Sequence, residues 1–471
     1  MKLFASSRIR LRLIGFSGAT MLILFAALSG SKLVGQEATD AFPKAALLEG
    51  GPRAIYSSDP NDSWNRIFYY LFSRRIETRL SDQFAEGAPF VDGISTRLFE
   101  RDEIGDRAID PLYPSKFAST GTYLVLTDPA YANFKKALQD ALDDNGQRSP
   151  LARALMQSDL WGAHDILSVP FLRADEKDLG KLRLTVLDLI SRLIKKIALT
   201  PEEISTLRDN YSAAVREHSF PDVFAKDGGW VEVLWFYPRA HDEVAGFRRT
   251  ARVFVKPKMP QRDVQQFLNG IPDRLESDPI FGLDGVALVT QLLLIDSNGK
   301  LEPTPLTSEV QVRLFETVTK ASMKPNDGTL KMMDGSFERA RLQVCEISRR
   351  LFLEEPGSGG LVQEDDNSRA YAGHYGFAES EPVNQGSPDG STTVDAPVQV
   401  TLRVRCAFCH GEALTQLMTF AIVRPPHFHP PPVKILNSNE HETARLAIKE
   451  KEKQKEFQAL LAYFDRRMAR H

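Results

Sequence analysis

Three side chains in one short stretch of the chain have the types and the spacing for cofactor chemistry: Cys406, Cys409 and His410. Two thiols separated by two residues can reach the two vinyl groups on neighbouring edges of a porphyrin. The imidazole that follows can lie beneath the iron as an axial ligand. The stretch therefore predicts covalent capture of a porphyrin, which keeps the group bound outside the cytoplasm, where a dissociating cofactor is lost.

The hexapeptide Cys406–Gly411 fits C-x-x-C-H, the attachment pattern of covalent haem, and here the sequence resembles c-type cytochromes. The resemblance covers only this hexapeptide of a 471-residue chain. It implies one haem c, with thioethers at Cys406 and Cys409 and His410 as the proximal ligand of the iron. It does not imply the common cytochrome fold, because ordinary single-haem cytochromes carry the motif in a helix and this motif lies between two expected strands.

The same thiols allow two other interpretations. A C-x-x-C pair at a hairpin turn is also the shape of a zinc knuckle, which needs two further ligands. Those ligands would come from His410, His427, His429 or Cys345. A plain disulfide or an unligated pair is the remaining alternative. A redox-active C-x-x-C pair is expected before a helix in a βαβ unit, and this region does not have that pattern.

The sixth ligand of the iron is expected from a proline-bounded loop. His427 and His429 lie between Pro425-Pro426 and the prolines at 430–432, which fix the backbone and suit the presentation of an imidazole. Exposed, inert loop histidines are the competing interpretation. Met418 is in phase with Phe420 and Ile422 and is expected in the core. His374 is a weaker candidate ligand.

The N-terminus has the charge pattern of an export signal. Lys2, Arg8, Arg10 and Arg12 precede an uncharged stretch, residues 13–31. That stretch approaches the roughly 20 residues that a spanning helix needs. We therefore expect residues 1–35 to be a signal peptide or a membrane anchor, and the protein to be periplasmic or otherwise extracytoplasmic.

Composition excludes several classes of function. The formal net charge of −3 and the lack of a basic tract give no reason to expect nucleic acid as a partner. With only three cysteines the chain is not a disulfide scaffold, and two of the three belong to the motif. Cys345 is expected to be a buried, small apolar residue. A redox partner protein is the expected partner.

The elements that position the motif are expected to form an α+β protein. Residues 36–63 read as a linker and residues 64–220 as a mostly helical region. Within it, Pro150 starts one helix, an apolar stripe marks another over 182–197, and Thr200–Glu203 forms a capping box that opens a third.

The second half of the chain is expected to be rich in strands. Residues 221–354 contain five short apolar runs, with an Asn298-Gly299 hairpin turn after one of them: 231–236, 250–255, 286–295, 309–315 and 340–352. Residues 355–396 are rich in Gly, Ser and Pro and predict a flexible loop. Residues 397–471 would hold the motif at the turn of a hairpin, the Pro/His loop and a terminal helix whose Lys449–Lys453 stretch faces solvent.

Two functions are compatible with these features. One is an exported haem protein that transfers electrons or does other redox chemistry. The other is a binding or structural protein of the cell envelope, in which zinc or haem clips the C-terminal hairpin. No Ser–His–Asp pattern, phosphate loop or pair of catalytic carboxylates stands out, so the sequence does not decide whether the protein is an enzyme.

Overall fold

A computed structural model of the chain describes these residues: 45–47, 50–72, 74–80, 97–99, 124–126, 130–168, 176–234, 248–260, 263–267, 283–318, 329–331, 337–364, 369–372, 398–401, 434–436 and 442–465. All of them belong to one compact unit, Phe42–His471. The expected signal or anchor, residues 1–35, lies outside them. None of the described helices is long and apolar enough to cross a membrane.

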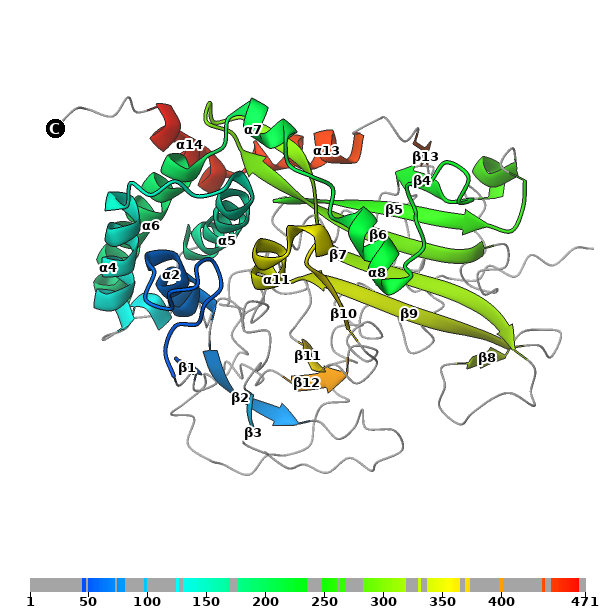
Figure 1. Ribbon diagram of the computed structural model, residues 1–471, viewed down its shortest axis with the longest axis horizontal. Coiled ribbons are helices and arrows are strands. Elements are labelled where there is room, and N and C mark those ends of the chain that lie inside the picture. The colour runs from blue at the N-terminus through cyan, green and yellow to red at the C-terminus, as the bar shows by residue number, and fades with distance from the viewer. Residues whose placement is uncertain are drawn as a thin grey trace, which may run out of the picture. The chain divides into compact units, whose positions relative to one another are not determined.

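The described residues form an α+β structure whose largest element is an antiparallel sheet (Figure 1). Its strands run in the order β10-β9-β7-β6-β5-β4-β13, with β8 also paired to β9. Their bounds are β4 Val231–Leu234, β5 Arg249–Pro257, β6 Leu283–Ile295, β7 Leu301–Val318, β8 Thr329–Lys331, β9 Phe337–Ile347, β10 Leu361–Glu364 and β13 Lys434–Ile435. The five expected strand regions therefore all contribute to one sheet.

The hairpin between β6 and β7 shows how the sequence sets the register. Gly299 has φ +81°, a left-handed conformation that glycine adopts without steric cost. The backbone N–H of Asp296 donates to the Lys300 carbonyl at 2.8 Å, and the Asp296 carboxylate accepts from the Asn298 and Lys300 amides. The Asn298-Gly299 turn expected from the sequence is confirmed.

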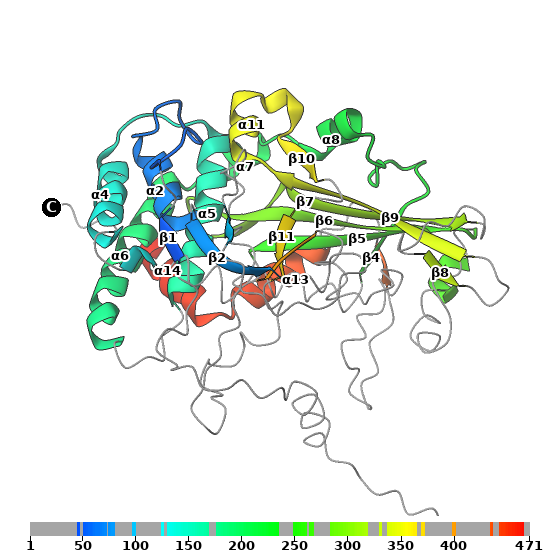
Figure 2. The ribbon, with the colours of Figure 1, turned by 90° about the horizontal axis from the view of Figure 1, so that it is seen from below.

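Four helices lie beside one end of this sheet, as Figures 1 and 2 both show: α2 Ser63–Phe72, α4 Ala130–Asp143, α5 Pro150–Ser168 and α6 Glu176–Ile197. They are followed along the chain by α7 Pro201–Ser205 and by α8 Tyr211–His218, which lies over one face of the sheet. The expected helix starts at Pro150 and at the Thr200 capping box are confirmed, since the Thr200 hydroxyl accepts from the Glu203 amide and the Glu203 carboxylate accepts from the Thr200 amide. The described part of region 64–220 also contains strands, which the sequence did not predict.

Helix α5 is the central helix, because it packs on α2, α6, α11, α14 and β6. Its Gln157 side chain joins it to the end of β6. The Gln157 amide nitrogen donates to the Ile295 carbonyl at 2.8 Å, and the Gln157 amide oxygen accepts from the Ile295 N–H at 2.9 Å. A side-chain amide thus occupies the place of a neighbouring strand, which satisfies backbone groups that a buried strand end would otherwise leave unpaired.

A second, smaller sheet contains β1 Ala45–Leu47, β2 Arg74–Leu80, β3 Arg97–Phe99, β11 Arg369–Ala372 and β12 Val398–Thr401. Strand β12 pairs with β11 in antiparallel orientation and with β2 in parallel orientation. The alternating pattern that begins at Val398 is therefore a strand over the residues described, as expected.

Three expectations about the second half of the chain need correction. The expected strand 340–352 ends at Ile347, because the Ser348 hydroxyl accepts from the Leu351 amide and starts helix α11, Arg349–Glu354. The expected flexible loop 355–396 contains ordered elements: the 3-10 helix η5, Pro356–Ser358, and strands β10 and β11. The reason is that Gly359 and Gly360, both at positive φ, reverse the chain so that β10 pairs with β9.

The third correction concerns the C-terminus, where two helices replace the one expected. Helix α13 spans Glu442–Lys451 and helix α14 spans Lys455–Asp465. Figures 1 and 2 place α13 on one side of the larger sheet and α8 with α11 on the other.

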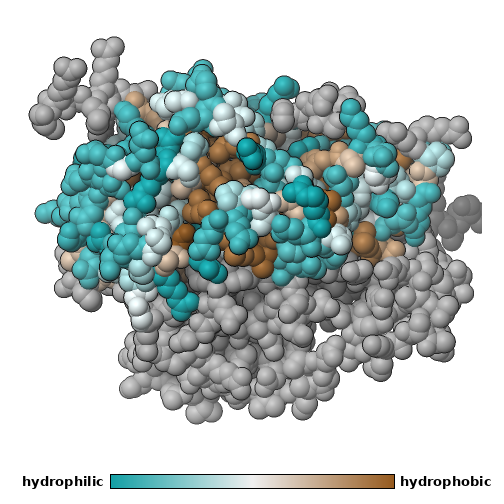
Figure 3. Space-filling model, viewed as in Figure 1, coloured by the Kyte–Doolittle hydropathy of each residue, from teal (hydrophilic) through white to brown (hydrophobic). Residues whose placement is uncertain are grey.

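One hydrophobic core joins the helices to the sheet, and it includes Phe68, Trp161, Ile190 and Val289. The chain before α2, expected as a linker, also contributes to it, since Ile55 and Tyr56 are buried. The face drawn in Figure 3 is hydrophilic over α4 and α6, and hydrophobic residues gather near its centre, where the helices meet the sheet. Most of the apolar side chains of the helical region therefore point inwards.

Candidate functional site

All of the expected cofactor residues lie outside the residues that the structure describes. These are Cys406, Cys409, His410, His427 and His429, together with the weaker candidates Met418 and His374. The hairpin proposed for the motif lies outside them too. What the structure does give is the position of the described residues on each side of the motif, in strands β12 and β13.

The last described residue before the motif is Thr401 of β12, which is paired with Arg369 of β11 in the smaller sheet. After it, the chain enters the larger sheet at β13, where Ile435 is paired with Val233 of β4. The Ile435 amide donates to the Gln265 side chain at 3.1 Å, and the Leu436 amide donates to the Glu232 carbonyl at 2.9 Å. Segment 402–433 thus begins at one sheet and ends at the other.

The third cysteine, Cys345, lies in β9 between β7 and β10 and is fully buried. It is part of the main core cluster. The expectation of a buried, small apolar residue is confirmed. A buried thiol in a core strand is poorly placed for attack on a cofactor, because nucleophilic cysteines need exposure and a positive environment.

Helix α5 carries two buried carboxylates that the sequence analysis did not single out. The first, Asp159, has 1% of its surface exposed. Its two oxygens accept from the Arg349 guanidinium at 2.6 and 2.7 Å, and one of them also accepts from the Tyr56 hydroxyl at 2.5 Å. This bidentate pair neutralises both charges in the interior. Burial, and then the charge of Asp159, raise the pKa of Tyr56 well above its ordinary value, so that this hydroxyl stays protonated.

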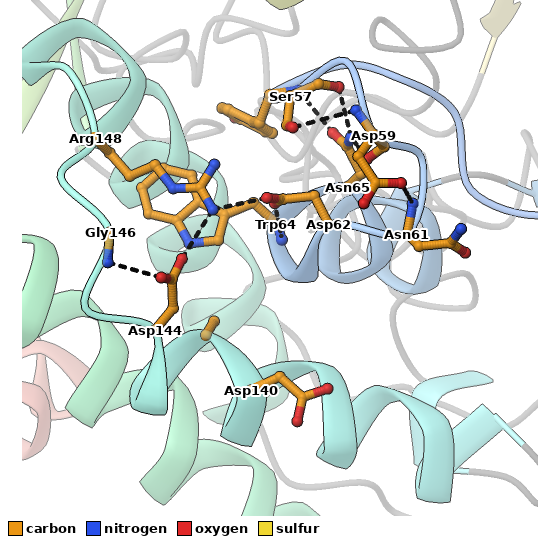
Figure 4. A network of polar contacts seen from close by, with 12 residues as sticks. Ser57, Asp59, Asn61, Asp62, Trp64, Asn65, Asp140, Asp144, Gly146 and Arg148 are labelled. Atoms are coloured by element: carbon orange, nitrogen blue, oxygen red, sulfur yellow. Dashed lines mark hydrogen bonds and ion pairs between the residues drawn. The ribbon is translucent and has the colours of Figure 1, made fainter.

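The loop that presents Tyr56 is fixed by Asn65 of α2 (Figure 4). The Asn65 amide oxygen accepts from the amides of Ile55 and Tyr56, and its amide nitrogen donates to the carbonyls of Ser57 and Asp59. All of the hydrogen-bonding capacity of this fully buried side chain is therefore used.

A second part of this network ties α2 to the chain between α4 and α5. The Arg148 guanidinium donates to Asp62 at 2.7 Å and to Asp144 at 2.9 Å, and it lies over the Trp64 ring, 5.1 Å from its centroid (Figure 4). The Arg148 hydrogen bond, followed by a backbone N–H from Gly146, lowers the pKa of Asp144. The network therefore orders the start of the helical region.

The second carboxylate of α5, Asp165, binds two cations that come from distant parts of the chain. One of its oxygens lies 2.6 Å from the Lys451 amine and 3.0 Å from the Arg248 guanidinium. Burial alone would raise the pKa of Asp165, but the charges of Lys451 and Arg248 outweigh it and hold the pKa well below its ordinary value. Burial lowers the pKa of Lys451, and the charge of Asp165 opposes this shift.

The position of Lys451 corrects the expectation that the stretch 449–453 is a solvated face. Lys451 has 0% of its surface exposed, and its amine also donates to the Gln454 side chain at 2.7 Å. A signal for this burial was present in the sequence. Lys451 lies seven residues after Ala444 and four after Ala447, which places all three on one face of a helix. Both alanines are buried.

Two of the remaining histidines have structural partners. His164 is buried, with its Nδ1 3.4 Å from the Ser168 hydroxyl one turn later in α5. His218, at the end of α8, has its Nε2 2.7 Å from the Leu361 carbonyl of β10. The contact of His218 therefore joins a helix to the larger sheet.

These arrangements can hold elements together, but they do not form a site for cofactor chemistry. Asp159 and Asp165 are each paired with cations, and the described residues contain no group of three or more His, Cys, Asp or Glu side chains that could hold a metal ion. No protein-family model, curated protein or solved structure matches this chain.

Proposed function

We propose that this chain is an exported protein that carries one covalently attached haem c and transfers electrons or does other redox chemistry. Cys406 and Cys409 form the thioethers and His410 is the proximal ligand of the iron. The observation that carries the proposal is the C-x-x-C-H sequence itself, which supplies two thiols and an imidazole at the spacing that haem attachment needs.

Two further observations support it. The only other cysteine, Cys345, is buried in a core strand, so the thiols available for attachment are those of the motif. The N-terminal sequence, basic and then apolar, is that of chains sent out of the cytoplasm, which is the compartment in which haem c is found. A redox partner protein outside the cytoplasm would then supply or accept the electron.

The sixth ligand in this proposal is His427 or His429. The motif follows β12 and these histidines precede β13, so the segment that carries both ends at two anchored strands. Prolines beside the two histidines reduce the entropy cost of holding an imidazole at the iron. Met418 or His374 would take the place if neither histidine binds.

A second candidate function is a binding or structural protein of the cell envelope, whose C-terminal hairpin is clipped by zinc or haem. The observation that favours it is size. A carrier of one haem needs only about 100 residues, whereas a packed body of helices and an extensive sheet precedes the motif here. In this function the body binds a partner and the metal group stabilises the hairpin.

Denaturation tests whether the group held by the motif is covalent haem. We expect protein exported together with haem-maturation machinery to keep a red chromophore after denaturation, with the mass of one haem and a pyridine haemochrome spectrum, because thioethers survive unfolding. Replacing Cys406 and Cys409 by alanine abolishes attachment, and Cys345→Ala, the matched control, does not. Loss of all haem on denaturation, or one equivalent of tightly bound zinc, contradicts the haem c proposal.

A further inference from the structure

The two C-terminal helices, α13 and α14, are joined to the body of the protein at three points, and we refer to the pair as the clasp. At the first point, the Lys451 amine enters between α5 and the start of β5 and reaches Asp165, which also binds Arg248. At the second, the Phe457 ring of α14 lies 5.6 Å from the Trp161 ring of α5. The Lys451 amine lies over both rings, 5.3 Å from the Trp161 centroid and 6.0 Å from that of Phe457.

The third point is the C-terminal end of α14. There the Lys195 amine of α6 donates to the carbonyls of Tyr463 and Phe464, at 2.9 and 3.0 Å. A cation at this position satisfies carbonyls that have no partner inside the helix and opposes the negative end of the helix dipole. The clasp is therefore bound by Lys451 at the end of α13, by Lys195 at the end of α14, and by the packing of Phe457 on Trp161 between these two points.

Lys451 also determines the shape of the clasp. It is the last residue of α13, and its amine binds the Gln454 side chain just before α14 begins at Lys455. The break between the helices allows both Lys451 and Phe457 to face α5. A buried amine is costly unless it is paired. An apolar side chain of the same size would fill the space without that cost, but it would not select Asp165 as its partner.

The clasp is linked in turn to the end of the segment that carries the motif. Strand β13 begins at Lys434, five residues after His429. The Lys434 amine binds the carboxylate of Glu442, the first residue of α13, at 2.5 Å. Strand β13 is held by β4 on one side of this link, and α13 is held by Asp165 on the other. The first described residues after His427 and His429 are therefore joined to α13 as well as to β4.

We propose that Lys451 is a positioning residue, which locks the clasp onto α5 and so fixes the downstream end of segment 402–433 relative to the body. The part that concerns haem rests on the proposed function. If His427 or His429 is the sixth ligand, the lock at Lys451 holds that imidazole at its distance from the iron. The lock itself does not depend on haem and is testable without it.

The test compares Lys451→Met with Lys453→Met in the full-length protein. Lys453 is the matched control, since it lies two residues away, has 57% of its side chain exposed and pairs with Glu450 of the same clasp. We expect Lys451→Met to raise hydrogen exchange at the amides of 442–465 by about tenfold or more while exchange in β6 stays unchanged, because local opening exposes only the clasp. Lys453→Met leaves both rates unchanged.

The second readout is the ferric haem spectrum of the same variants. Lys451→Met shifts the iron from low spin towards high spin and increases its binding of cyanide, and Lys453→Met does neither. Unchanged exchange at 442–465 overturns the lock. Faster exchange with an unchanged haem spectrum overturns the positioning role. Wild-type protein without covalent haem overturns the proposed function, and the exchange measurement still decides whether the lock exists.

Should Lys451→Met fail to fold, Gln454→Ala keeps the proposal testable. It removes one acceptor of the Lys451 amine and leaves the ion pair with Asp165 in place. We expect a smaller rise of exchange at the same amides, and no rise there counts against the lock.

Discussion

Each of the two carboxylates of helix α5 is paired with a cation, and the partners come from different parts of the chain. Asp159 is neutralised by Arg349 and accepts a hydrogen bond from Tyr56, and both residues precede the motif in sequence. Asp165 is neutralised by Arg248 and by Lys451, which follows the motif. The Asp159 cluster can therefore form from residues 1–354 alone, whereas the Asp165 cluster is complete only when the C-terminal helices have packed. Helix α5 therefore carries two ion-pair clusters. The Asp159 cluster lies within the body, and the Asp165 cluster connects the body to the C-terminal helices.

The chemistry of the cations differs in the same way. Arg349 forms a bidentate pair with fixed geometry, and its guanidinium also lies over the Phe68 ring, 5.5 Å from the centroid. Lys451 contributes a single, compact charge on a flexible stem. Rigid pairing thus holds the body together, and a more adaptable pair holds the clasp.

The largest expected effect is at Arg349. Arg349→Met leaves the buried Asp159 carboxylate without its bidentate cation, and we expect the free energy of unfolding to fall by about 3–5 kcal/mol. Urea unfolding followed by tryptophan fluorescence measures this. The neighbouring Arg350 is the matched control, because its side chain is 39% exposed and pairs with Glu354 in the same helix. Arg350→Met should cost at most about 0.5 kcal/mol, and equal losses for the two variants would contradict the distinction drawn here.

A smaller effect is expected from the pH dependence of the Asp165 cluster. Because the folded-state pKa of Asp165 lies below its unfolded value, the carboxylate contributes stability above pH 4, roughly the unfolded value. That contribution is lost as the pH falls below 4 towards the lower, folded-state pKa. The unfolding free energy of Asp165→Asn should therefore decline less steeply over this range than that of the wild type.

Asp144→Asn serves as the comparison for that measurement. The pKa of Asp144 is lowered as well, in the same direction, but its side chain is 29% exposed and its pair with Arg148 is screened by solvent. We expect Asp144→Asn to reduce the acid-induced fall of the unfolding free energy less than Asp165→Asn does. The reverse order would show that the surface network, and not the buried cluster, governs acid unfolding.

The smallest expected effect is at Tyr56. Tyr56→Phe removes one hydrogen bond to Asp159 and leaves the Arg349 pair intact, so the unfolding free energy should fall by about 1–1.5 kcal/mol. Chemical denaturation at neutral pH measures it. A loss of about 3 kcal/mol or more, the range for breaking a buried ion pair, would mean that the Tyr56 hydroxyl is the main partner of the carboxylate.

Local sequence signals predicted the elements whose structure depends on neighbours in the chain. Thr200 and Glu203 form the expected capping box, and Asn298-Gly299 forms the expected turn. Apolar runs over 231–236 and 286–295 mark β4 and β6, since short β-rich runs between turn residues are typical of strands. In the capping box and the turn, the decisive contacts lie within a few residues of one another.

The features that the sequence analysis missed depend on contacts between distant residues. A charged stretch such as 449–453 is usually solvated. The spacing of Lys451 from the buried Ala444 and Ala447 indicates its helix face, but the carboxylate that neutralises it, Asp165, is far away in the chain. In the same way, Gly359 and Gly360 indicate a loop until β9 is available to pair with β10. The candidate haem site remains a prediction from sequence, because its residues lie outside those that the structure describes.

The order of strands in the larger sheet has a consequence for how the chain folds. The described strands β4, β5, β6, β7, β9 and β10 lie side by side in the order in which they occur in the sequence. Strand β13 is the exception, because it pairs with β4 although it comes from the C-terminal part of the chain. Such a meander closes short loops first, and short loops cost little entropy to close. A chain that emerges from its N-terminus can therefore complete most of the sheet before β13 and the last two helices have been made.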